Sequence, residues 1–373
     1  MKNCKNMKIS IGFKYTENAY GGGNNFVKNF TTQLIKDGYK VVFDLKDRDI
    51  DFIILINPLK SSEFSTFDNV DILYYQNFKN KNAISIQRFN ECDERKATTN
   101  INKKLIKKNK NIDFNVFVSH WLSDIFDSIN ESKPFKVIMG GPDSSMFNQL
   151  DKKPWSGDFP INMITHHWSN HKNKGFDVYE HIDNLLDNKF WRNRLNFTIV
   201  GNVPNSYKYR NTKVIKPLKG FEIASYLKSS DIYITASKNE PSGNHHMEAA
   251  MCGLPILYMK SGGVEEYCRD YGVEFTLVNF ESSINKLMLE YSTYFDRLQK
   301  YPYTFHNLYK EYIEIFEKLN NNSQEIINNR SKVNKNVLII KYFLNKLVKK
   351  IRVIIVKCMI NIGNFKKTIL WKP

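Results

Sequence analysis

Short apolar runs alternate with amphipathic stretches along the first 150 residues of the chain. Amphipathic spacing predicts helices over Asn25–Asp37 and His120–Ile129. The short apolar runs predict strands, which are Lys8–Phe13, Lys40–Asp44, Asp51–Asn57, Asp71–Tyr75, Ala83–Gln87, Asn115–Ser119 and Lys136–Met139. Because strands that alternate with helices form parallel sheets covered on both faces, we expect an α/β, Rossmann-like domain here.

A polar segment containing proline and glycine, Gln149–Pro160, interrupts this alternation, which then restarts. The second set of strands is expected at Ile161–Thr165, Phe197–Val200, Lys213–Ile215, Asp231–Thr235 and Ile256–Met259. Its helices are expected at Asp177–Leu186, Glu222–Lys228 and Gly243–Met251, with further helical patterns from Ser282 to Leu319. We therefore predict two Rossmann-like domains, residues 1–150 and 151–320, and a tail, residues 321–373. Ligands of such sheets bind at the carboxyl ends of the strands, so the cleft between the domains is the expected site.

Composition supports a folded protein of this size, because 373 residues with a hydrophobic fraction of 42% suit two domains. The five cysteines are scattered and lack CxxC spacing, which favours a reducing cytoplasm over disulfides or structural zinc. The apolar run Ile9–Phe13 is too short for a signal peptide. No uncharged stretch approaches the roughly 20 residues that span a bilayer.

The positive charge is concentrated in the tail. From Arg330 to Pro373 there are twelve Lys and Arg residues and no Asp or Glu, and these twelve supply all but +5 of the net charge of +17. The body is therefore not basic enough to suggest nucleic-acid binding. On a helical wheel, Ile340–Cys358 separates apolar from basic residues, which is typical of a helix on an anionic membrane surface. A terminal helix docked on the body, or a dimerising coiled coil, is the alternative.

Candidate chemistry is densest in residues 237–263, SKNEPSGNHHMEAAMCGLPILYMKSGG. Pro241 and Gly243 prevent a helix from beginning before about residue 242. Glu240 is therefore expected in a loop and Glu248 in the second turn of the following helix, so that both can face one pocket. The free amides of the helix start suit a diphosphate, and the two carboxylates suit hydroxyl groups of a sugar and a ribose. An ordinary strand–turn–helix with surface glutamates is the alternative.

This stretch resembles the family 4 glycosyltransferases, or glycosyl transferases group 1, which have the GT-B fold. The matching residues are Ser237, Glu240, Pro241, Gly243, Glu248, Ala249, Gly253, Pro255, Gly262 and Gly263. The resemblance implies retaining transfer of a sugar from a nucleoside-diphosphate sugar, with no metal or other cofactor. It implies a catalytic contact of Glu240 with the transferred sugar and a ribose contact of Glu248. It also implies that the amides of Ser242, Gly243 and Asn244 contact sugar and diphosphate.

Two further segments bear on the donor. The glycine run Gly21–Gly23 resembles the family's N-terminal glycine loop, and Gly23 is expected to approach the donor. After the first strand of the second domain, the family has Gly-Arg-Leu and then Lys-Gly, whose cations neutralise the diphosphate. This chain has THHWS from residue 165 and then Lys174 followed by glycine, so the lysine is kept as a catalytic residue and the arginine is missing. His167, or else His166, is the candidate replacement, and a histidine that merely packs is the alternative.

The acceptor is expected on the segment RFNECDERK, residues 88–96, which lies where related enzymes carry acceptor-side residues. We expect Arg88, Asn90, Glu91 and Asp93 to face the acceptor, although a salt-bridged structural loop fits the same charges. No metal site is expected, because the Asp-x-Asp at residues 47–49 precedes a strand rather than ending one.

The sequence thus predicts a retaining, metal-independent hexosyltransferase that acts on a hydroxyl of a glycan or lipid-linked acceptor. The basic tail adds a location, in the cytoplasm at the inner face of the cell membrane, and a role in surface polysaccharide or glycolipid assembly. The alternatives are a GT-B sugar-nucleotide epimerase or glycan phosphorylase, and a non-catalytic carbohydrate-binding or membrane scaffold on a degenerate GT-B body.

Overall fold

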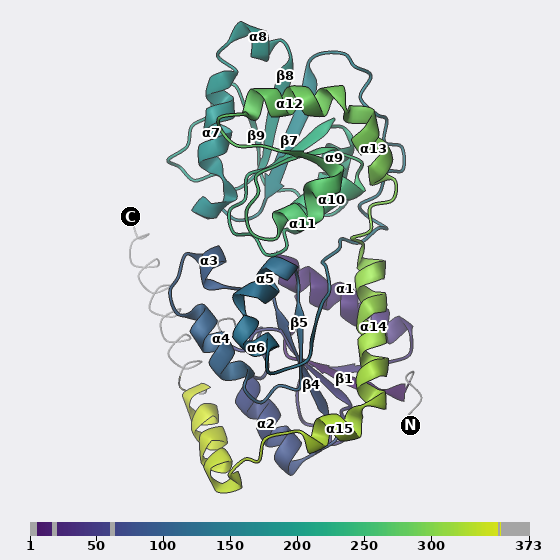
Figure 1. The fold of residues 1–373 in the computed structure, drawn as a ribbon, viewed down its shortest axis with the longest axis vertical. Coiled ribbons are helices and arrows are strands. Elements are labelled where there is room, and N and C mark those ends of the chain that lie inside the picture. The colour runs from purple at the N-terminus through teal and green to yellow at the C-terminus, as the bar shows by residue number, and fades with distance from the viewer. Residues whose placement is uncertain (1–5, 17–20, 60–63, 350, 352–373) are drawn as a thin grey trace, which may run out of the picture.

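Two six-stranded parallel sheets form two domains that stack along the long axis of the molecule (Figure 1). The structure, a computed structural model, describes residues 6–16, 21–59, 64–349 and 351. The first sheet has the order β2-β1-β3-β4-β5-β6. Its strands are β1 (Lys8–Ile11), β2 (Lys40–Val42), β3 (Phe52–Leu55), β4 (Ile84–Phe89), β5 (Phe114–Phe117) and β6 (Phe135–Val137). The helices of this half are α1 (Gly22–Lys36), α2 (Asn69–Phe78), α3 (Asp93–Lys96), α4 (Ile101–Asn109), α5 (His120–Ile125) and α6 (Asp127–Asn130).

The second sheet has the order β12-β11-β10-β7-β8-β9. Its strands are β7 (Ile161–His167), β8 (Leu195–Gly201), β9 (Lys213–Ile215), β10 (Ile232–Thr235), β11 (Ile256–Tyr258) and β12 (Gly272–Glu274). Its helices are α7 (Phe176–Leu185), α8 (Lys189–Arg192), α9 (Phe221–Lys228), α10 (Asn244–Met251), α11 (Val264–Cys268), α12 (Phe280–Leu289) and α13 (Tyr291–Leu298), with 3-10 turns at Lys172–Lys174 and Arg269–Tyr271. The predicted pair of parallel α/β domains is confirmed.

Burial explains why the sequence pattern predicted most of these strands. Every residue of the central strands β3, β4, β5 and β10 is buried, because helices cover both faces of a parallel sheet. Edge strands β2 and β6 are only partly covered. Continuous apolar runs are therefore the expected signal for the central strands, and weaker runs are expected for the edges.

The prediction of a strand at Asp71–Tyr75 is wrong, because these residues lie in α2. The carboxylate of Asp68 accepts hydrogen bonds from the amides of Val70 and Asp71, and the carboxylate of Asp71 accepts one from the amide of Asp68. This reciprocal cap stabilises the helix start and outweighs the strand preference of the apolar run.

Residues 305–319, which were assigned to the second domain, pack on the first. Helix α14 (Phe305–Asn321) places Leu308, Tyr312 and Phe316 in one core cluster with Phe30 and Phe52 of the N-terminal domain. In Figure 1, α14 runs alongside the first sheet, and α15 (Ser323–Asn328) follows it. The chain therefore crosses between the domains twice.

After α15 the tail forms a helix over residues 335–349, and the rest of the predicted amphipathic segment lies outside the described residues, apart from residue 351. This helix lies beside α2 (Figure 1), where the ring of Tyr342 stacks on Tyr74 at 3.8 Å between centroids. Among the described residues, no helix is both long enough and apolar enough to cross a membrane.

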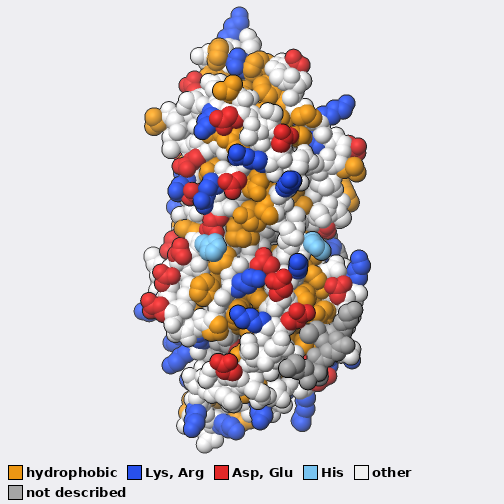
Figure 2. Space-filling model, turned by 45° about the vertical axis from the view of Figure 1, so that its right-hand side comes forward, with side chains coloured by type: hydrophobic (Ala, Val, Ile, Leu, Met, Phe, Trp, Pro, Cys, Tyr) orange, Lys and Arg blue, Asp and Glu red, His pale blue; other side chains and the backbone are white. Residues whose placement is uncertain are grey.

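The body carries charges of both signs. On the face drawn in Figure 2, basic and acidic side chains are interspersed over both domains, and no single basic surface stands out. This face offers no broad positive surface of the kind that nucleic-acid binding needs.

Candidate active site

Glu240 lies in the loop between β10 and α10, as predicted, and the loop turns sharply to hold it there. Asn239 adopts a positive φ of 51°, and Glu240 forms an isolated parallel bridge with Gly262. A side chain at Gly262 would place its Cβ 2.6 Å from the backbone nitrogen of Glu240, and the φ of Gly262 is +65°. Only glycine satisfies both conditions, so Gly262 lets its own segment pack closely against the Glu240 loop.

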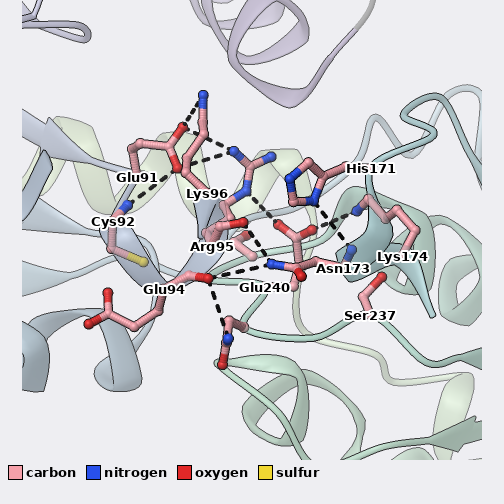
Figure 3. A network of polar contacts seen from close by, with 12 residues as sticks. Glu91, Cys92, Glu94, Arg95, Lys96, His171, Asn173, Lys174, Ser237 and Glu240 are labelled. Carbon is pink, nitrogen blue, oxygen red and sulfur yellow. Dashed lines mark hydrogen bonds and ion pairs between the residues drawn. The ribbon is translucent and has the colours of Figure 1, made fainter. Parts of the chain in front are cut away.

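The Glu240 carboxylate is buried and held by two cations. Its exposed fraction is 6%, with Lys174 Nζ 2.6 Å from Oε2 and Arg95 Nε 3.3 Å from Oε1 (Figure 3). Burial alone raises the pKa of Glu240, but the charges of Lys174 and Arg95 outweigh burial and lower the pKa to about 2. Glu240 is therefore ionised at neutral pH.

Glu248 lies in the second turn of α10 and contacts the end of β7. Its Oε2 is 2.7 Å from Nε2 of His166, and both side chains are largely buried. The hydroxyl of Tyr233 accepts a hydrogen bond from the backbone amide of His166, which fixes that residue at the strand end. Neither Glu240 nor Glu248 is turned to bulk solvent, so the alternative of two surface glutamates does not describe this site.

His167 occupies a different environment from His166. Its ring is buried, lies edge-on to Phe176 at 5.0 Å and stacks parallel to Tyr179 at 6.2 Å. Burial, together with the positive charge of Lys174, lowers the pKa of His167 to about 3, so the ring is neutral. This arrangement favours the alternative that His167 packs within its domain, and it moves the candidate polar contact to His166.

The start of α10 faces the glycine loop of the other domain. A Cβ at Gly22 would lie 3.4 Å from Oδ1 of Asn244, and a Cβ at Gly23 would lie 3.9 Å from Nδ2 of Asn90. The hydroxyl of Ser242 accepts a hydrogen bond from that of Tyr267 at 3.0 Å. Gly243 is the N-cap of α10. At this helix start Gly22, the neighbour of the predicted donor residue Gly23, thus lies beside Asn244, whereas Gly23 lies beside Asn90 of its own domain.

Three of the four predicted acceptor residues make structural contacts, and the fourth lies beside the glycine loop. Asp93 accepts hydrogen bonds from the hydroxyl of Thr98 and from the amides of Ile101 and Asn102, where it caps α4. Burial by itself raises the pKa of Asp93, but these hydrogen bonds stabilise the carboxylate more strongly, so the pKa is lowered. This part of the segment follows the structural-loop alternative.

Arg88 and Glu91 are also engaged. The guanidinium of Arg88 lies over the ring of Phe26, 4.2 Å from its centroid, and the side chain is buried. Glu91 pairs with Arg95 and with Lys96, each at 3.0 Å. Of the four predicted acceptor residues, Asn90 is the one that lies next to the glycine loop.

Sequence reasoning missed Arg95, which is the cross-domain cation of the site. The available signal was the spacing of four residues between Glu91 and Arg95, which favours an ion pair in a helical segment; in the structure Glu91 lies just before α3 and Arg95 lies within it. It also missed Glu266, whose carboxylate accepts hydrogen bonds from the first two amides of α5, those of His120 and Trp121, both at 2.7 Å.

The two domains touch directly at the site. A surface cavity lies beside the interdomain linker, where it is lined by Lys152, Trp155 and Asp231 among others. At the site itself the contact between Arg95 and Glu240 joins the two domains. Among the described residues there is no group of three or more His, Cys, Asp or Glu side chains placed to hold a metal ion.

Residues 169–290, about a third of the chain, match the family model described as glycosyl transferases group 1. This segment contains Lys174, Glu240 and Glu248. The family recognition made from the motif is therefore confirmed. No curated protein matches the chain.

Solved structures with the GT-B architecture match most of the chain. Sucrose-phosphate synthase from Thermosynechococcus elongatus is 12% identical with a TM-score of 0.59, and the match covers 84% of this chain and 99% of that one. Anabaena HepE in complex with UDP is 13% identical with a TM-score of 0.62, covering 84% and 100%. WaaG, a glycosyltransferase involved in lipopolysaccharide biosynthesis, is 13% identical with a TM-score of 0.56, covering 83% and 99%. At these identities the matches show the fold alone, which is the predicted GT-B fold.

Proposed function

Because residues 169–290 carry a glycosyl transferases group 1 segment on a GT-B fold, we propose that this chain transfers a sugar from a nucleoside-diphosphate sugar to a hydroxyl acceptor. The observation that carries the proposal is the buried, ionised Glu240 between Lys174 and Arg95, at the amide-rich start of α10. A buried carboxylate held by two cations between two domains suits a ligand that is both polar and anionic.

The donor is proposed to lie across the start of α10. The amides of Ser242, Gly243 and Asn244 face the diphosphate, because the start of a helix favours anions. Glu248, held by His166, accepts hydrogen bonds from the ribose hydroxyls. The complex of Anabaena HepE with UDP makes a uridine nucleotide the first to test.

Departure of the nucleoside diphosphate builds negative charge on the phosphate oxygens and positive character on the sugar carbon. Lys174 and the helix-start amides stabilise the phosphate charge in a site from which water is largely excluded. Glu240 remains ionised, so it orients the sugar and offsets its positive character. The acceptor hydroxyl attacks from the face that the leaving group vacates and gives its proton to an oxygen of the departing diphosphate, so the anomeric configuration is retained.

The finer predictions belong to the same proposal. The transferred sugar is a hexose, and the positive charge that a metal would supply comes from side chains, so activity is expected to persist in EDTA. Gly23 and Asn90 line the donor and acceptor side of the glycine loop. The contacts of Arg88, Glu91 and Asp93 hold the acceptor segment in place.

The acceptor is proposed to be a glycan or a lipid-linked sugar at the inner face of the cell membrane. The helix over residues 335–349 supports this location, because it docks on the body through Leu338, Tyr342, Asn345 and Lys349 and leaves its other apolar side chains outward. Asn345 donates hydrogen bonds to the carboxylate of Asp68, at 2.9 and 3.1 Å, and Lys349 Nζ lies 2.6 Å from Asp71 Oδ2. The exposed apolar side chains of this helix and of residue 351 are 44–61% exposed and comprise Val337, Ile340, Phe343, Leu344, Leu347, Val348 and Ile351.

An exposed apolar face on a strongly basic segment suits an anionic lipid surface, which gains both apolar burial and charge attraction. A lipid-linked acceptor then lies on the side of the N-terminal domain where the helix docks. We place the enzyme in surface polysaccharide or glycolipid assembly on this basis.

The experiment that tests the function has two stages. The melting temperature is first measured with UDP-, GDP-, ADP- and CMP-sugars, because a ligand that binds only the folded state raises it. Slow hydrolysis of the stabilising donor, without acceptor, is then compared between the wild type and Glu240→Gln. We expect hydrolysis to fall by about 100-fold or more in the variant, the loss expected for a group that stabilises charge in the transition state.

Failure at either stage would contradict the proposal. A chain that no nucleotide sugar stabilises is not a transferase of this kind and fits the scaffold alternative. Analysis of products with donor alone, and with donor plus phosphate, distinguishes an epimerase and a phosphorylase from a transferase.

A further inference from the structure

The donor site lacks a cation in the segment where the group 1 resemblance leads us to expect one. The run that begins at the end of β7 has histidines and a tryptophan where the family pattern has arginine, and Lys174 is the residue of that run that reaches Glu240. A leaving nucleoside diphosphate carries several negative charges, and one lysine neutralises only part of them.

Arg95 brings a second cation from the other domain. Its Nε is 3.3 Å from Oε1 of Glu240, while Lys174 Nζ is 2.6 Å from Oε2 of the same carboxylate (Figure 3). The two cations therefore flank one carboxylate and are close enough to bracket one diphosphate. The Nη2 group of Arg95 makes no hydrogen bond within the described part of the chain, so it is available to donate to a ligand.

The position of Arg95 is set from both domains. Within its own domain, Glu91 accepts hydrogen bonds from Nη1. From the second domain, Asn173 Nδ2 donates to the backbone oxygen of Arg95 at 3.0 Å and Asn239 Nδ2 donates to that of Glu94 at 3.3 Å. Arg95 thus reaches the site only while the two domains are in contact.

Arg95 stays protonated at the site. Although burial disfavours the cation, Glu240 and Glu91 together raise the pKa of Arg95 above its ordinary value. When a donor sugar takes over Glu240, the guanidinium loses one partner and can turn to phosphate oxygens, which it binds with two donors at once.

We infer that Arg95 is the second diphosphate-binding cation of this enzyme and takes the place of the missing arginine from the opposite domain. This inference rests on the proposed function and adds a catalytic residue to it. It also couples catalysis to domain contact, because in the open enzyme Lys174 would be the one side-chain cation on the diphosphate.

The test compares nucleotides that differ only in phosphate charge. Dissociation constants for uridine, UMP and UDP, and for the guanosine and adenosine series, are measured by calorimetry on the full chain. The variants are Arg95→Gln and Arg95→Lys. The matched control is Lys96→Gln, which removes a neighbouring cation that also pairs with Glu91.

We expect Arg95→Gln to weaken diphosphate binding by about 10-fold or more and to leave nucleoside binding unchanged. Arg95→Lys should recover part of the loss, and Lys96→Gln should bind all three ligands like the wild type. Donor turnover should fall together with diphosphate affinity.

An unchanged ratio of diphosphate to nucleoside affinity in Arg95→Gln would overturn the inference, even if its melting temperature fell, because the pair with Glu240 would then be structural only. If Arg95→Gln did not fold, the same ratio in Arg95→Lys would decide, since that variant keeps the charge but loses the planar fork. A wild type that binds none of the nucleotides would instead refute the proposed function.

Discussion

Helix α10 and the helix over residues 335–349 use their two faces in opposite ways. In α10 the apolar and aromatic residues are buried, and its polar Glu248 reaches His166 at the edge of the site. In the tail helix Asn345 and Lys349, together with Leu338 and Tyr342, contact the body, while apolar side chains such as Phe343 point outward. In the proposed function the first helix serves a ligand within the molecule and the second a surface outside it.

This difference shows why amphipathicity does not by itself say which face of a helix meets the protein. The carboxylates of Asp68 and Asp71 lie at the start of α2, where a reciprocal cap already holds them. They bind Asn345 and Lys349, and beside these contacts Tyr342 stacks on Tyr74 of α2, so the docked face of the tail helix carries both polar and aromatic side chains. Three predictions test whether the two helices are indeed used in these separate ways.

The largest effect is expected at α10. Glu248→Gln keeps the shape of the side chain but removes its charge. A hydrogen bond to a charged group contributes about 1.5–3 kcal/mol, so the KM for the donor should rise by about 10- to 100-fold with a smaller change in kcat. Initial rates over a range of donor concentrations measure both constants. The control is Glu265→Gln on α11, which pairs with Lys260 at the surface and should leave the kinetics unchanged.

A smaller effect is expected at the tail helix. The double change Leu344→Asn and Leu347→Asn should weaken binding to vesicles of phosphatidylglycerol and phosphatidylcholine by about 10-fold, because apolar area no longer enters the lipid. Transfer to a soluble acceptor should be unaffected. The matched control replaces two exposed apolar residues of the second domain, Val278→Asn and Leu289→Asn. Equal vesicle binding by both double variants would show that the apolar face does not meet lipid.

The smallest effect concerns stability and pH. Burial lowers the pKa of His246 on α10 from 6.5 to about 3, so the unfolded chain binds a proton in this range that the folded chain does not. Stability is therefore complete above pH 6.5 and falls as the pH drops toward 3. Between pH 7 and 5.5 this histidine alone should reduce the free energy of unfolding by about 1 kcal/mol.

Urea unfolding at the two pH values measures this loss. The loss should be smaller by the same amount in His246→Phe, because phenylalanine does not titrate. The exposed His181 provides the control, since His181→Gln should leave the pH dependence unchanged. If His246→Phe lost as much stability on acidification as the wild type, His246 would not be the titrating group.

The α10 side of the site could be predicted because its geometry is local. A buried strand, a proline–glycine break and a helix start all lie within a few residues, so they place Glu240 and Glu248 without knowledge of the rest of the fold. The role of Arg95 could not be predicted in this way. Its contact with Glu240 joins residues 145 positions apart and depends on how the two domains meet.

Other differences have similar causes. The strand prediction at Asp71–Tyr75 weighed the apolar run and overlooked the cap formed by Asp68. The prediction for His167 could not separate two adjacent histidines, of which alternation along β7 turns one toward Glu248 and the other toward Phe176 and Tyr179. The helical pattern of α14 was clear, but nothing in its sequence indicates which domain it covers.

The return of α14 to the first domain limits how the two halves can move. Where the chain crosses, the amide of Phe305 donates to the backbone oxygen of Pro142 at 2.9 Å, and a Cβ at Gly141 would lie 2.2 Å from the carbonyl carbon of Thr304. The outgoing and returning segments are thus pinned together at one pivot. In Figure 1 this pivot is on the right and α3 is on the left. Any opening that preserves it swings Arg95 through a wide arc while the linker side barely shifts.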